Sequence, residues 1–399
     1  MDLRQKNNNY LSIYLLFALC ILADAAVCIF LGGYDGWDIK GHWSICAYTL
    51  RGYNPYLLIG AETGPFSDII GIPENFSTVP WGCLLGSAYY AGFLPLTGAC
   101  VYNFIMHFVF AFLTVLVIYK TFAEFVGTKR SVVLSALLIV SHFSFMYSVY
   151  YGNAGGIICS MLIISIFLAK SNPYISGILL SLTMSKPQIA AIICIIYVFE
   201  GRWKAIITAA LIDIAAWLAV SLMTDTGIVD LLIQTFSSGT ASPVQYLGLF
   251  SVIKHMGVEK GIVLMMNVFA GVTYTIGLWY YLKKKSDSAV NQLVFYVPAC
   301  IASTFWIYKN GTDYMILAFA VIFFAVLFLN NKMSLRDRIV SWICMGYLLM
   351  SRCAVYIGII VSGENQVAID FVKSLDGLLI AVSGIIFCRM WTKYNSKIN

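Results

Sequence analysis

Long apolar runs divide this chain, and most are close to the length that a helix needs to cross a lipid bilayer. About 20 apolar residues cover the hydrocarbon core, which is about 30 Å thick. Twelve uninterrupted runs lie at about residues 11–31, 101–120, 131–151, 154–170, 174–184, 187–199, 203–223, 260–282, 290–308, 312–330, 338–361 and 375–391. The pattern predicts an all-α polytopic membrane protein with about 12 (11–13) transmembrane helices in a single membrane domain over residues 1–399.

The composition excludes a soluble protein of this length. Hydrophobic residues make up 60% of the chain and charged residues 11%, and the mean hydropathy is +0.83. A soluble domain carries about 45–50% apolar and about 25% charged residues. The net charge of +6 is dispersed among the apolar runs, so it does not predict nucleic-acid binding. Most of the 11 cysteines lie within apolar runs, and no CxxC or HExxH motif appears, so no metal site is expected.

Basic residues predict which connections face the cytoplasm. Most of the lysines and arginines cluster near residues 4–6, 120–130, 170, 202–204, 283–285, 332–338 and 389–397. The positive-inside rule places these connections, and both ends of the chain, in the cytoplasm. An even number of crossings then follows. The run at 80–96, interrupted by three glycines and a proline, is therefore a re-entrant or short segment, or else it crosses and one short run does not.

The first outer loop, residues 32–79, carries two carboxylates directly after the first span. Residues 38–50 are expected to form a juxtamembrane helix, capped by Asp38 and lying along the membrane surface with Trp43 and Tyr48 at the interface. Asp35 and Asp38 are candidate functional carboxylates. The alternative is that one caps the helix and the other is a solvated loop residue.

A short hairpin at 174–199 turns at Ser185-Lys186-Pro187-Gln188. Its arms hold roughly 11 and 13 residues, which at about 1.5 Å per residue is less than a full crossing. Lys186 is therefore expected in a pocket among helices, where an ammonium group is costly unless it meets an anion. A lipid-linked phosphate is the predicted partner, and snorkelling to the headgroups is the alternative.

Other polar residues lie at short connections or within spans. The tight turn at 306–314 presents Lys309 and Asp313 at the outer interface. The glycine-rich connection at 150–156 carries Asn153, and its glycines permit close approach of a ligand. Arg352 lies in the middle of a predicted span, where an ionisable residue is functional by default.

Four ordered features resemble a polyprenyl-phosphate-sugar-dependent glycosyltransferase of the GT-C superfamily, and most of all glycosyltransferase family 87, which includes mannosyltransferases. They are Asp38 with His42-Trp43 and Gly52-Tyr-Asn-Pro-Tyr56; Val79-Pro80-Trp81; Gly152-Asn153 followed by Lys186-Pro187 and Gly201-Arg-Trp203; and Asp313-Tyr314. The chain departs from the family pattern at His42, where tyrosine is common, and at Asn153, where glutamine is common. It also has a single proline, Pro80, where a pair of prolines is usual.

The resemblance implies a GT-C-like bundle and an inverting transfer of mannose or another sugar from a polyprenyl phosphate to a hydroxyl of a glycan or glycolipid. Asp38 is the expected general base, with Asp35 as the alternative. Donor phosphate ligands would be Lys186, Arg352 and Lys309. No cofactor is expected, because the lipid-linked sugar is itself a co-substrate. The expected substrate-binding residues are Tyr34, Trp37, His42, Trp43, Asn54, Tyr56, Trp81, Asn153, Gln188, Asp313 and Tyr314.

Two other functions remain open at this point. A polysaccharide polymerase also has many spans, but it usually has large arginine-rich outer loops, and the first outer loop here holds only Arg51. A flippase for a lipid-linked sugar would predict matching broken helices in two halves, and one such hairpin is visible. The residue usage suggests a bacterial plasma membrane with the active site on its outer face. Sequons at Asn75 and Asn310 leave an endoplasmic reticulum membrane open.

Overall fold

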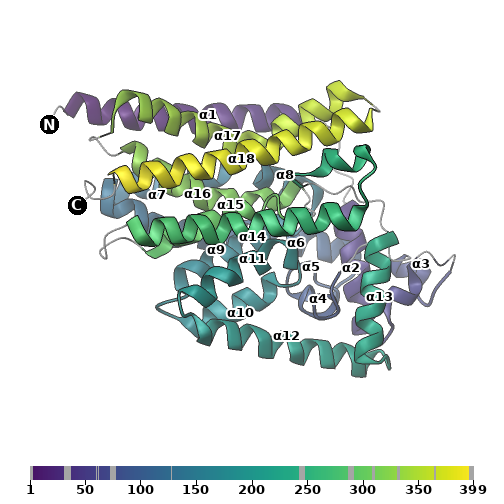
Figure 1. The fold of residues 1–399 in the computed structure, drawn as a ribbon. Helices are drawn as coiled ribbons and strands as arrows, with labels where there is room; N and C mark the ends of the chain where they lie inside the picture. Colours follow the sequence, from purple (N-terminus) through teal and green to yellow (C-terminus); the bar gives the residue numbers. More distant parts are fainter. Residues whose placement is uncertain are drawn as a thin grey trace.

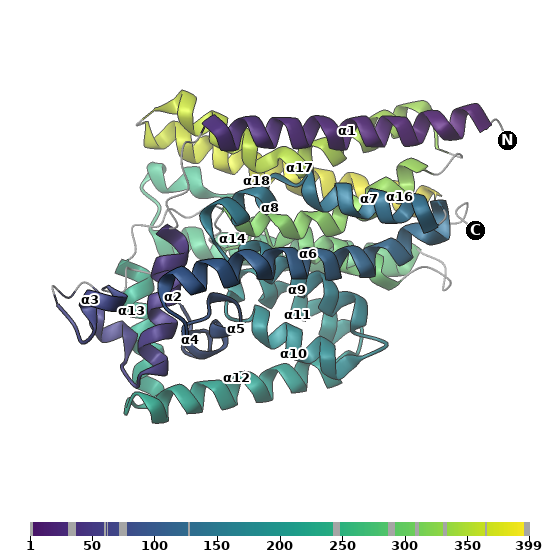
Figure 2. The ribbon, with the colours of Figure 1, turned by 180° about the vertical axis from the view of Figure 1, so that it is seen from behind.

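The computed structural model describes residues 3–30, 37–59, 61, 63–71, 78–126, 128–241, 248–285, 292–307, 311–329, 333–363 and 365–394. Every regular element within these residues is a helix, and they contain no strand. The helices pack side by side, as Figures 1 and 2 show from opposite sides. The prediction of an all-α protein is confirmed, whereas the assignment of residues 1–399 to one membrane domain stays a prediction.

Seven helical segments in this part of the chain are long and apolar enough to cross a membrane. They are formed by α1 (Leu3–Phe30), α6 (Leu96–Val126), α12 (Trp203–Met223), α14 (Lys260–Lys285), η4 (Gly311–Leu317) with α16 (Ala318–Leu329), α17 (Leu335–Ser362) and α18 (Gln366–Tyr394). An eighth exists if α7 (Thr128–Val140) and α8 (Phe143–Tyr151), which meet at a 57° bend, form one broken span. The chain is thus a multi-pass membrane protein.

The predicted count of about 12 transmembrane helices is not confirmed. Several apolar runs form helices of only 10–17 residues, namely α9 (Gly155–Leu168), α10 (Pro173–Thr183), α11 (Pro187–Phe199) and the pair η3 (Gln292–Tyr296) and α15 (Val297–Ala302). At about 1.5 Å per residue, such helices extend roughly 15–25 Å, which is less than the bilayer core. Protein surrounds α9, whose side chains are buried from Gly155 to Ile166, whereas α10 exposes Tyr174, Ile175 and Ile178.

The helices form a bundle with two apolar elements at its centre. The α9 side chains from Gly155 to Ile166 and the α16 side chains from Ala318 to Phe328 are all buried. A helix that is apolar on every side needs neighbours on every side. Figures 1 and 2 show α1, α17 and α18 along one flank and α12 along the opposite flank, with α9 and α16 between them.

Shorter elements gather at one end of the bundle, away from the start of α1 and the end of α18 (Figure 1). They are α2 (Trp37–Leu50), η1 (Pro55–Leu58), α3 (Ser67–Ile70), α4 (Pro80–Leu85), α5 (Ser87–Tyr90), α13 (Ile228–Ala241) and η2 (Ser251–Met256). In the 80–96 segment, α4 and α5 meet at Gly86, and neither is long enough to cross a bilayer. Re-entry of this segment stays a prediction.

The helix predicted over residues 38–50 exists as α2, but its start and its surroundings differ from the prediction. It begins at Trp37, so Asp38 lies in the first turn rather than at the N-cap. Trp43 and Tyr48 are 1% and 0% exposed, so their placement at the membrane interface is wrong. The reason is tertiary packing: Trp43 Nε1 donates to the Leu94 carbonyl at 2.9 Å, and the Tyr48 hydroxyl donates to the Gly71 carbonyl at 2.9 Å.

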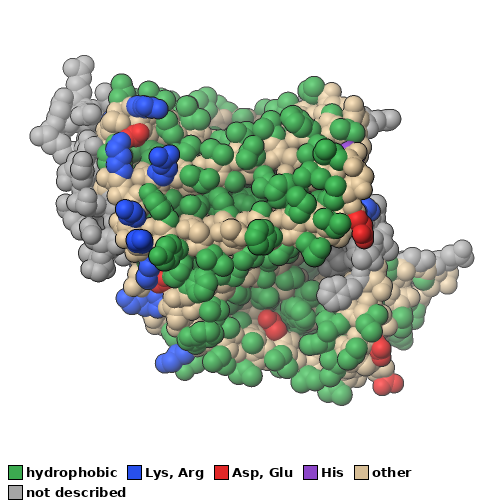
Figure 3. All heavy atoms as spheres, in the orientation of Figure 1, with side chains coloured by type: hydrophobic (Ala, Val, Ile, Leu, Met, Phe, Trp, Pro, Cys, Tyr) green, Lys and Arg blue, Asp and Glu red, His purple; other side chains and the backbone are tan. Residues whose placement is uncertain are grey.

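Charge is distributed unevenly along the bundle. Figure 3 shows lysine and arginine side chains gathered at the end where α1 begins and α18 ends. The last turn of α14 carries Lys283, Lys284 and Lys285, and the last turn of α18 carries Lys393. Hydrophobic side chains cover most of the visible flank between the two ends. This is the pattern that the positive-inside rule describes, although the side of the membrane stays a prediction.

Candidate active site

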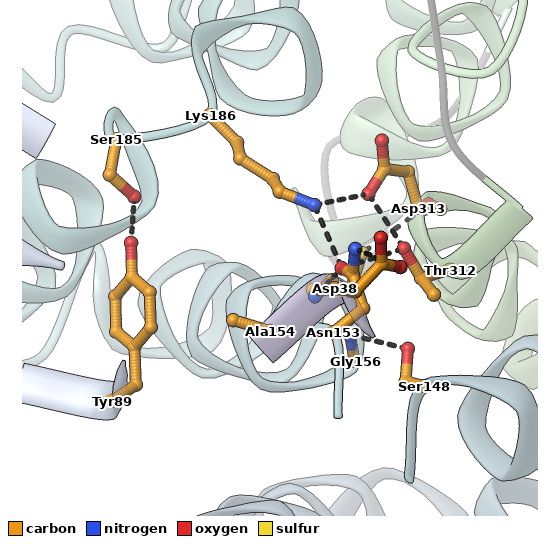
Figure 4. Close-up of polar contacts among 12 residues, drawn as sticks. Asp38, Tyr89, Ser148, Asn153, Ala154, Gly156, Ser185, Lys186, Thr312 and Asp313 are labelled. Atoms are coloured by element: carbon orange, nitrogen blue, oxygen red, sulfur yellow. Dashed lines mark hydrogen bonds and ion pairs between the residues drawn. The ribbon is translucent and has the colours of Figure 1, made fainter. Parts of the chain in front are cut away.

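Four helix ends bring polar side chains together at the end of the bundle opposite the basic one (Figure 4). Asp38 lies in the first turn of α2, and Asn153 lies between α8 and α9. Lys186 precedes α11, and Asp313 lies in the first turn of η4. The sequence marks all four residues as candidates, and the structure joins them in one chain of hydrogen bonds.

Lys186 forms the positive centre of this cluster. Pro187 begins α11, and a proline disfavours helical backbone in the residue before it, so Lys186 lies at the N-cap outside the helix. Its Nζ donates to Asn153 Oδ1 at 2.9 Å and forms an ion pair with Asp313 Oδ1 at 3.2 Å. Lys186 is 9% exposed and Asp313 0%. The snorkelling alternative is therefore wrong, because the ammonium points into the protein toward a carboxylate.

Asn153 connects Lys186 to Asp38. Gly152 ends α8 in the left-handed conformation (φ +66°), which reverses the chain and places Asn153 before α9. Asn153 Nδ2 donates to Asp38 Oδ2 at 3.0 Å. Gly155 permits η4 to approach, because a Cβ at this position would lie 2.4 Å from Thr312 Oγ1.

Asp38 is a buried carboxylate with an aromatic neighbourhood. It is 9% exposed, and the first turn of a helix is a favourable place for negative charge. One turn later, His42 stacks on Tyr90, with ring centroids 4.8 Å apart. Burial and the positive charge of Lys186 lower the pKa of His42 to about 3. The imidazole beside Asp38 is therefore neutral near pH 7.

Replacing His42 with phenylalanine is expected to reduce the acid sensitivity of folding. The ordinary imidazole pKa is about 6.5. As pH falls below this value, the unfolded chain binds a proton that the folded chain does not, so His42 lowers stability in acid and has no effect above. The melting temperature in detergent should fall less between pH 7 and pH 5 in His42→Phe than in the wild type. An equal fall in melting temperature in both proteins would refute the lowered pKa of His42.

Arg352 lies behind the η4 segment that carries Asp313. A side chain at Gly311 would meet its guanidinium group. The guanidinium carbon lies 6.0 Å from the Tyr314 ring centre and 4.7 Å from that of Tyr356, within cation–π range. Arg352 is 7% exposed, and its Nε and Nη1 atoms make no hydrogen bond within the described residues. Buried donors of this kind are costly unless an acceptor meets them.

Several predicted substrate-binding residues use their polar atoms within the protein. Asn54 Nδ2 donates to Thr226 Oγ1 at 3.1 Å and to Gln234 Oε1 at 2.8 Å. The Tyr56 hydroxyl donates to the Thr78 carbonyl at 2.5 Å. The Asn54 contacts hold the first outer loop against α13 and the residues before it, and the Tyr56 contact is made within the loop. A substrate role for Asn54 and Tyr56 stays a prediction.

The other predicted substrate ligands lie in different surroundings. Trp81 Nε1 donates to the Met184 carbonyl at 3.0 Å, just before the Lys186 turn. Gln188 is half-buried, and its backbone carbonyl accepts from Trp306 Nε1 at 2.8 Å. Trp37 begins α2, but its side chain is not described. Tyr34, Asp35 and Lys309 lie outside the described residues.

Sequence reasoning missed two residues of the cluster. Thr312 Oγ1 donates to Asn153 Oδ1 at 2.9 Å, and its place in the same turn as Asp313 is a signal that could have found it. The Tyr90 hydroxyl accepts from the Ala154 backbone N–H at 3.3 Å, beside Asn153. Tyr90 belongs to an interrupted apolar run with no polar pattern, so nothing in the sequence marks it.

This arrangement offers a carboxylate, a neutral imidazole and two buried cations at one end of the bundle. A carboxylate can accept a proton from a hydroxyl, and cations can stabilise a phosphate. The described residues contain no group of three or more His, Cys, Asp or Glu side chains placed to hold a metal ion. The chemistry available to these side chains includes proton transfer and anion stabilisation.

Comparison with known families identifies the chain. The sequence model of glycosyltransferase family 87 matches residues 89–304, just over half of the chain. The matched region includes Asn153 and Lys186, whereas Asp38, Asp313 and Arg352 lie outside it. Comparisons with curated proteins and with solved structures give no match. The protein is an enzyme that transfers sugars at a membrane, and it belongs to glycosyltransferase family 87.

Proposed function

We propose that this enzyme moves a sugar, mannose or another hexose or pentose, from a polyprenyl phosphate to a hydroxyl of a glycan or glycolipid, with inversion at the anomeric carbon. The observation that carries the proposal is the chain of contacts from Asp38 through Asn153 to Lys186. These contacts bring a carboxylate and an ammonium group into one site at an end of the helix bundle. No metal or cofactor takes part in the proposed reaction.

Asp38 acts as the general base in this proposal. A neutral hydroxyl is a weak nucleophile, so the carboxylate takes its proton as the oxygen attacks the anomeric carbon. A new carbon–oxygen bond forms while the bond from the anomeric carbon to the phosphate oxygen breaks. The polyprenyl phosphate leaves with the bonding electron pair, and Asp38 holds the proton. Asp35, just before α2 in the sequence, is the alternative base.

Cations stabilise the charge that develops on the leaving phosphate. Lys186 is already paired with Asp313, so its remaining capacity for a phosphate is limited. Arg352 has two buried nitrogen atoms without a partner among the described residues, and a phosphate oxygen would satisfy them. We therefore give Arg352 the larger share of phosphate binding, with Lys186 and Lys309 as supporting ligands.

The two substrates approach from different sides in this proposal. The site lies at the end of the bundle opposite the basic one, and we propose that it faces the outside of a plasma membrane. A polyprenyl chain would enter sideways from the bilayer, and a glycan would enter from the water. Tyr34, Trp37 and Trp81 are proposed to offer aromatic surface to sugar rings, whereas Trp43 is buried against Leu94.

The decisive experiment offers the purified protein a panel of polyprenyl-phosphate sugars together with a cell-envelope glycolipid extract. We expect release of polyprenyl phosphate with one donor, detected by mass spectrometry, and unchanged release in the presence of EDTA. Nucleotide sugars serve as the control and should give no transfer. Transfer from nucleotide sugars alone would overturn the donor assignment, and movement of the donor across a vesicle membrane without release would favour a flippase.

A further inference from the structure

We propose that Asn153 is a positioning residue that aims the Asp38 carboxylate, rather than a ligand of the substrate. This inference rests on the proposed role of Asp38 as the base. The Asn153 side chain is 1% exposed and touches Asp38, Lys186 and Thr312, which come from three different parts of the chain. Figure 4 shows it between these groups.

The orientation of the Asn153 amide is fixed by its partners. Oδ1 accepts from Lys186 Nζ at 2.9 Å and from the Gly155 backbone N–H at 2.8 Å. Both groups can only donate, so the oxygen must face them. The NH₂ group must then face Asp38 Oδ2, which it meets at 3.0 Å. The reverse orientation would set two donors against the amide nitrogen and an oxygen against the carboxylate.

The acceptor capacity of the amide is fully used inside the protein. Thr312 Oγ1 is a third donor to Oδ1, at 2.9 Å, and an amide oxygen offers two lone pairs. A substrate hydroxyl would have to displace Lys186, Thr312 or Gly155 to bind this oxygen. The backbone carbonyl oxygen of Asn153 faces the His107 ring of α6, 3.1 Å from Nε2. The residue is therefore held from both sides and can serve as a fixed support.

The positive charge of Lys186 strengthens the support that Asn153 gives to Asp38. A cation at the amide oxygen polarises the group and makes its N–H a better donor, and chains of hydrogen bonds reinforce one another in this way. Asp38 Oδ2 is thus held against the NH₂ group in the orientation that the structure shows. A general base that is held in one orientation does not lose conformational entropy when it aligns with the acceptor hydroxyl.

Replacement of Asn153 with aspartate tests the proposal. The variant keeps an acceptor for Lys186 and sets an oxygen about 3 Å from Asp38 Oδ2, and two carboxylates so close cannot both ionise. We expect the acid limb of the kcat/KM profile to move to higher pH by at least about 1 unit. The other titratable groups facing this pair are His42 and Tyr90 beside Asp38, His107 of α6, and Lys186 and Asp313.

Two further variants keep the test decisive. Asn267→Asp adds a carboxylate at another buried asparagine, outside the site, and should leave the acid limb in place. Thr312→Val removes one donor to Asn153, and with it the longer 3.3 Å contact to Asp313 Oδ1, without adding charge. It should lower kcat several-fold while donor KM stays unchanged. If Asn153→Asp does not fold, as judged by its melting temperature, the Thr312 variant carries the test.

The outcomes separate this inference from the proposed function. A fully active Asp38→Asn enzyme would overturn the role of Asp38 as the base and, with it, this inference, whereas sugar transfer with Asp35 as the base would stand. An inactive Asp38→Asn enzyme, together with an unmoved acid limb in Asn153→Asp, would overturn only the role of Asn153. A raised substrate KM with an unchanged pH profile would likewise overturn it, because that result marks a substrate ligand.

Discussion

Asp38→Asn is expected to lower the rate of sugar transfer by about 10²–10⁴-fold, the usual contribution of a general base. The amide cannot take the proton of the acceptor hydroxyl, but it keeps the size of the carboxylate and an oxygen that can accept from Asn153 Nδ2. The fold and donor binding should therefore persist. Release of polyprenyl phosphate per minute by purified enzyme measures the effect, and donor protection against thermal unfolding checks that the site remains assembled.

Two matched variants make the Asp38 result interpretable. Asp68→Asn removes an exposed carboxylate from the same outer loop and should keep full activity. Asp35→Asn tests the alternative base, since Asp35 stands three residues before Asp38. Full activity in Asp38→Asn with loss of activity in Asp35→Asn would move the base to Asp35. Full activity in both variants would show that neither Asp35 nor Asp38 is the general base.

Lys186→Met is expected to give the second large effect, this time on stability as well as activity. The change leaves the Asp313 carboxylate, which is 0% exposed, without its ion-pair partner at 3.2 Å. Removal of one partner of a buried ion pair typically costs about 3–5 kcal/mol. We expect a clear fall in melting temperature, followed in detergent by tryptophan fluorescence, together with loss of transfer.

The double variant Lys186→Met/Asp313→Asn separates the two effects. Removal of both charges relieves the stranded carboxylate, so much of the lost stability should return while transfer stays low. Lys393→Met provides the control, because it breaks an exposed ion pair with Asp337 and should leave the melting temperature nearly unchanged. An unchanged melting temperature in the Lys186→Met single variant would show that the Lys186–Asp313 ion pair does not stabilise the fold.

Local features of the sequence predict much of the site. The Lys186-Pro187 turn follows from the proline, and the connection at Gly152-Asn153 follows from the glycine. Asp38, Asn153, Lys186 and Asp313 each stand out as polar residues next to apolar runs. Their pairing could not be predicted, because residues 115–127 positions apart meet only through the packing of the whole bundle.

The helix count could not be predicted for a related reason. An apolar run reports that side chains avoid water, but lipid and protein interior satisfy this requirement equally well. The α9 helix is apolar because protein surrounds it, and Trp43 is buried rather than at the interface because Leu94 accepts its N–H. The 57° bend after α7 falls at Ser141 and His142, two polar residues that interrupt the apolar run.

The separation of Lys186 from its counter-ion has a consequence for biosynthesis. The two residues are 127 positions apart, so the ribosome makes Lys186 long before it makes Asp313. At about 5–20 residues per second, the lysine waits roughly 6–25 s for its carboxylate. A nascent chain that stops short of η4 carries an unpaired ammonium group in a nearly apolar hairpin. Completion of the cluster around Lys186 therefore waits for the late synthesis of η4, and a chain truncated before η4 differs from the finished enzyme by one unneutralised charge.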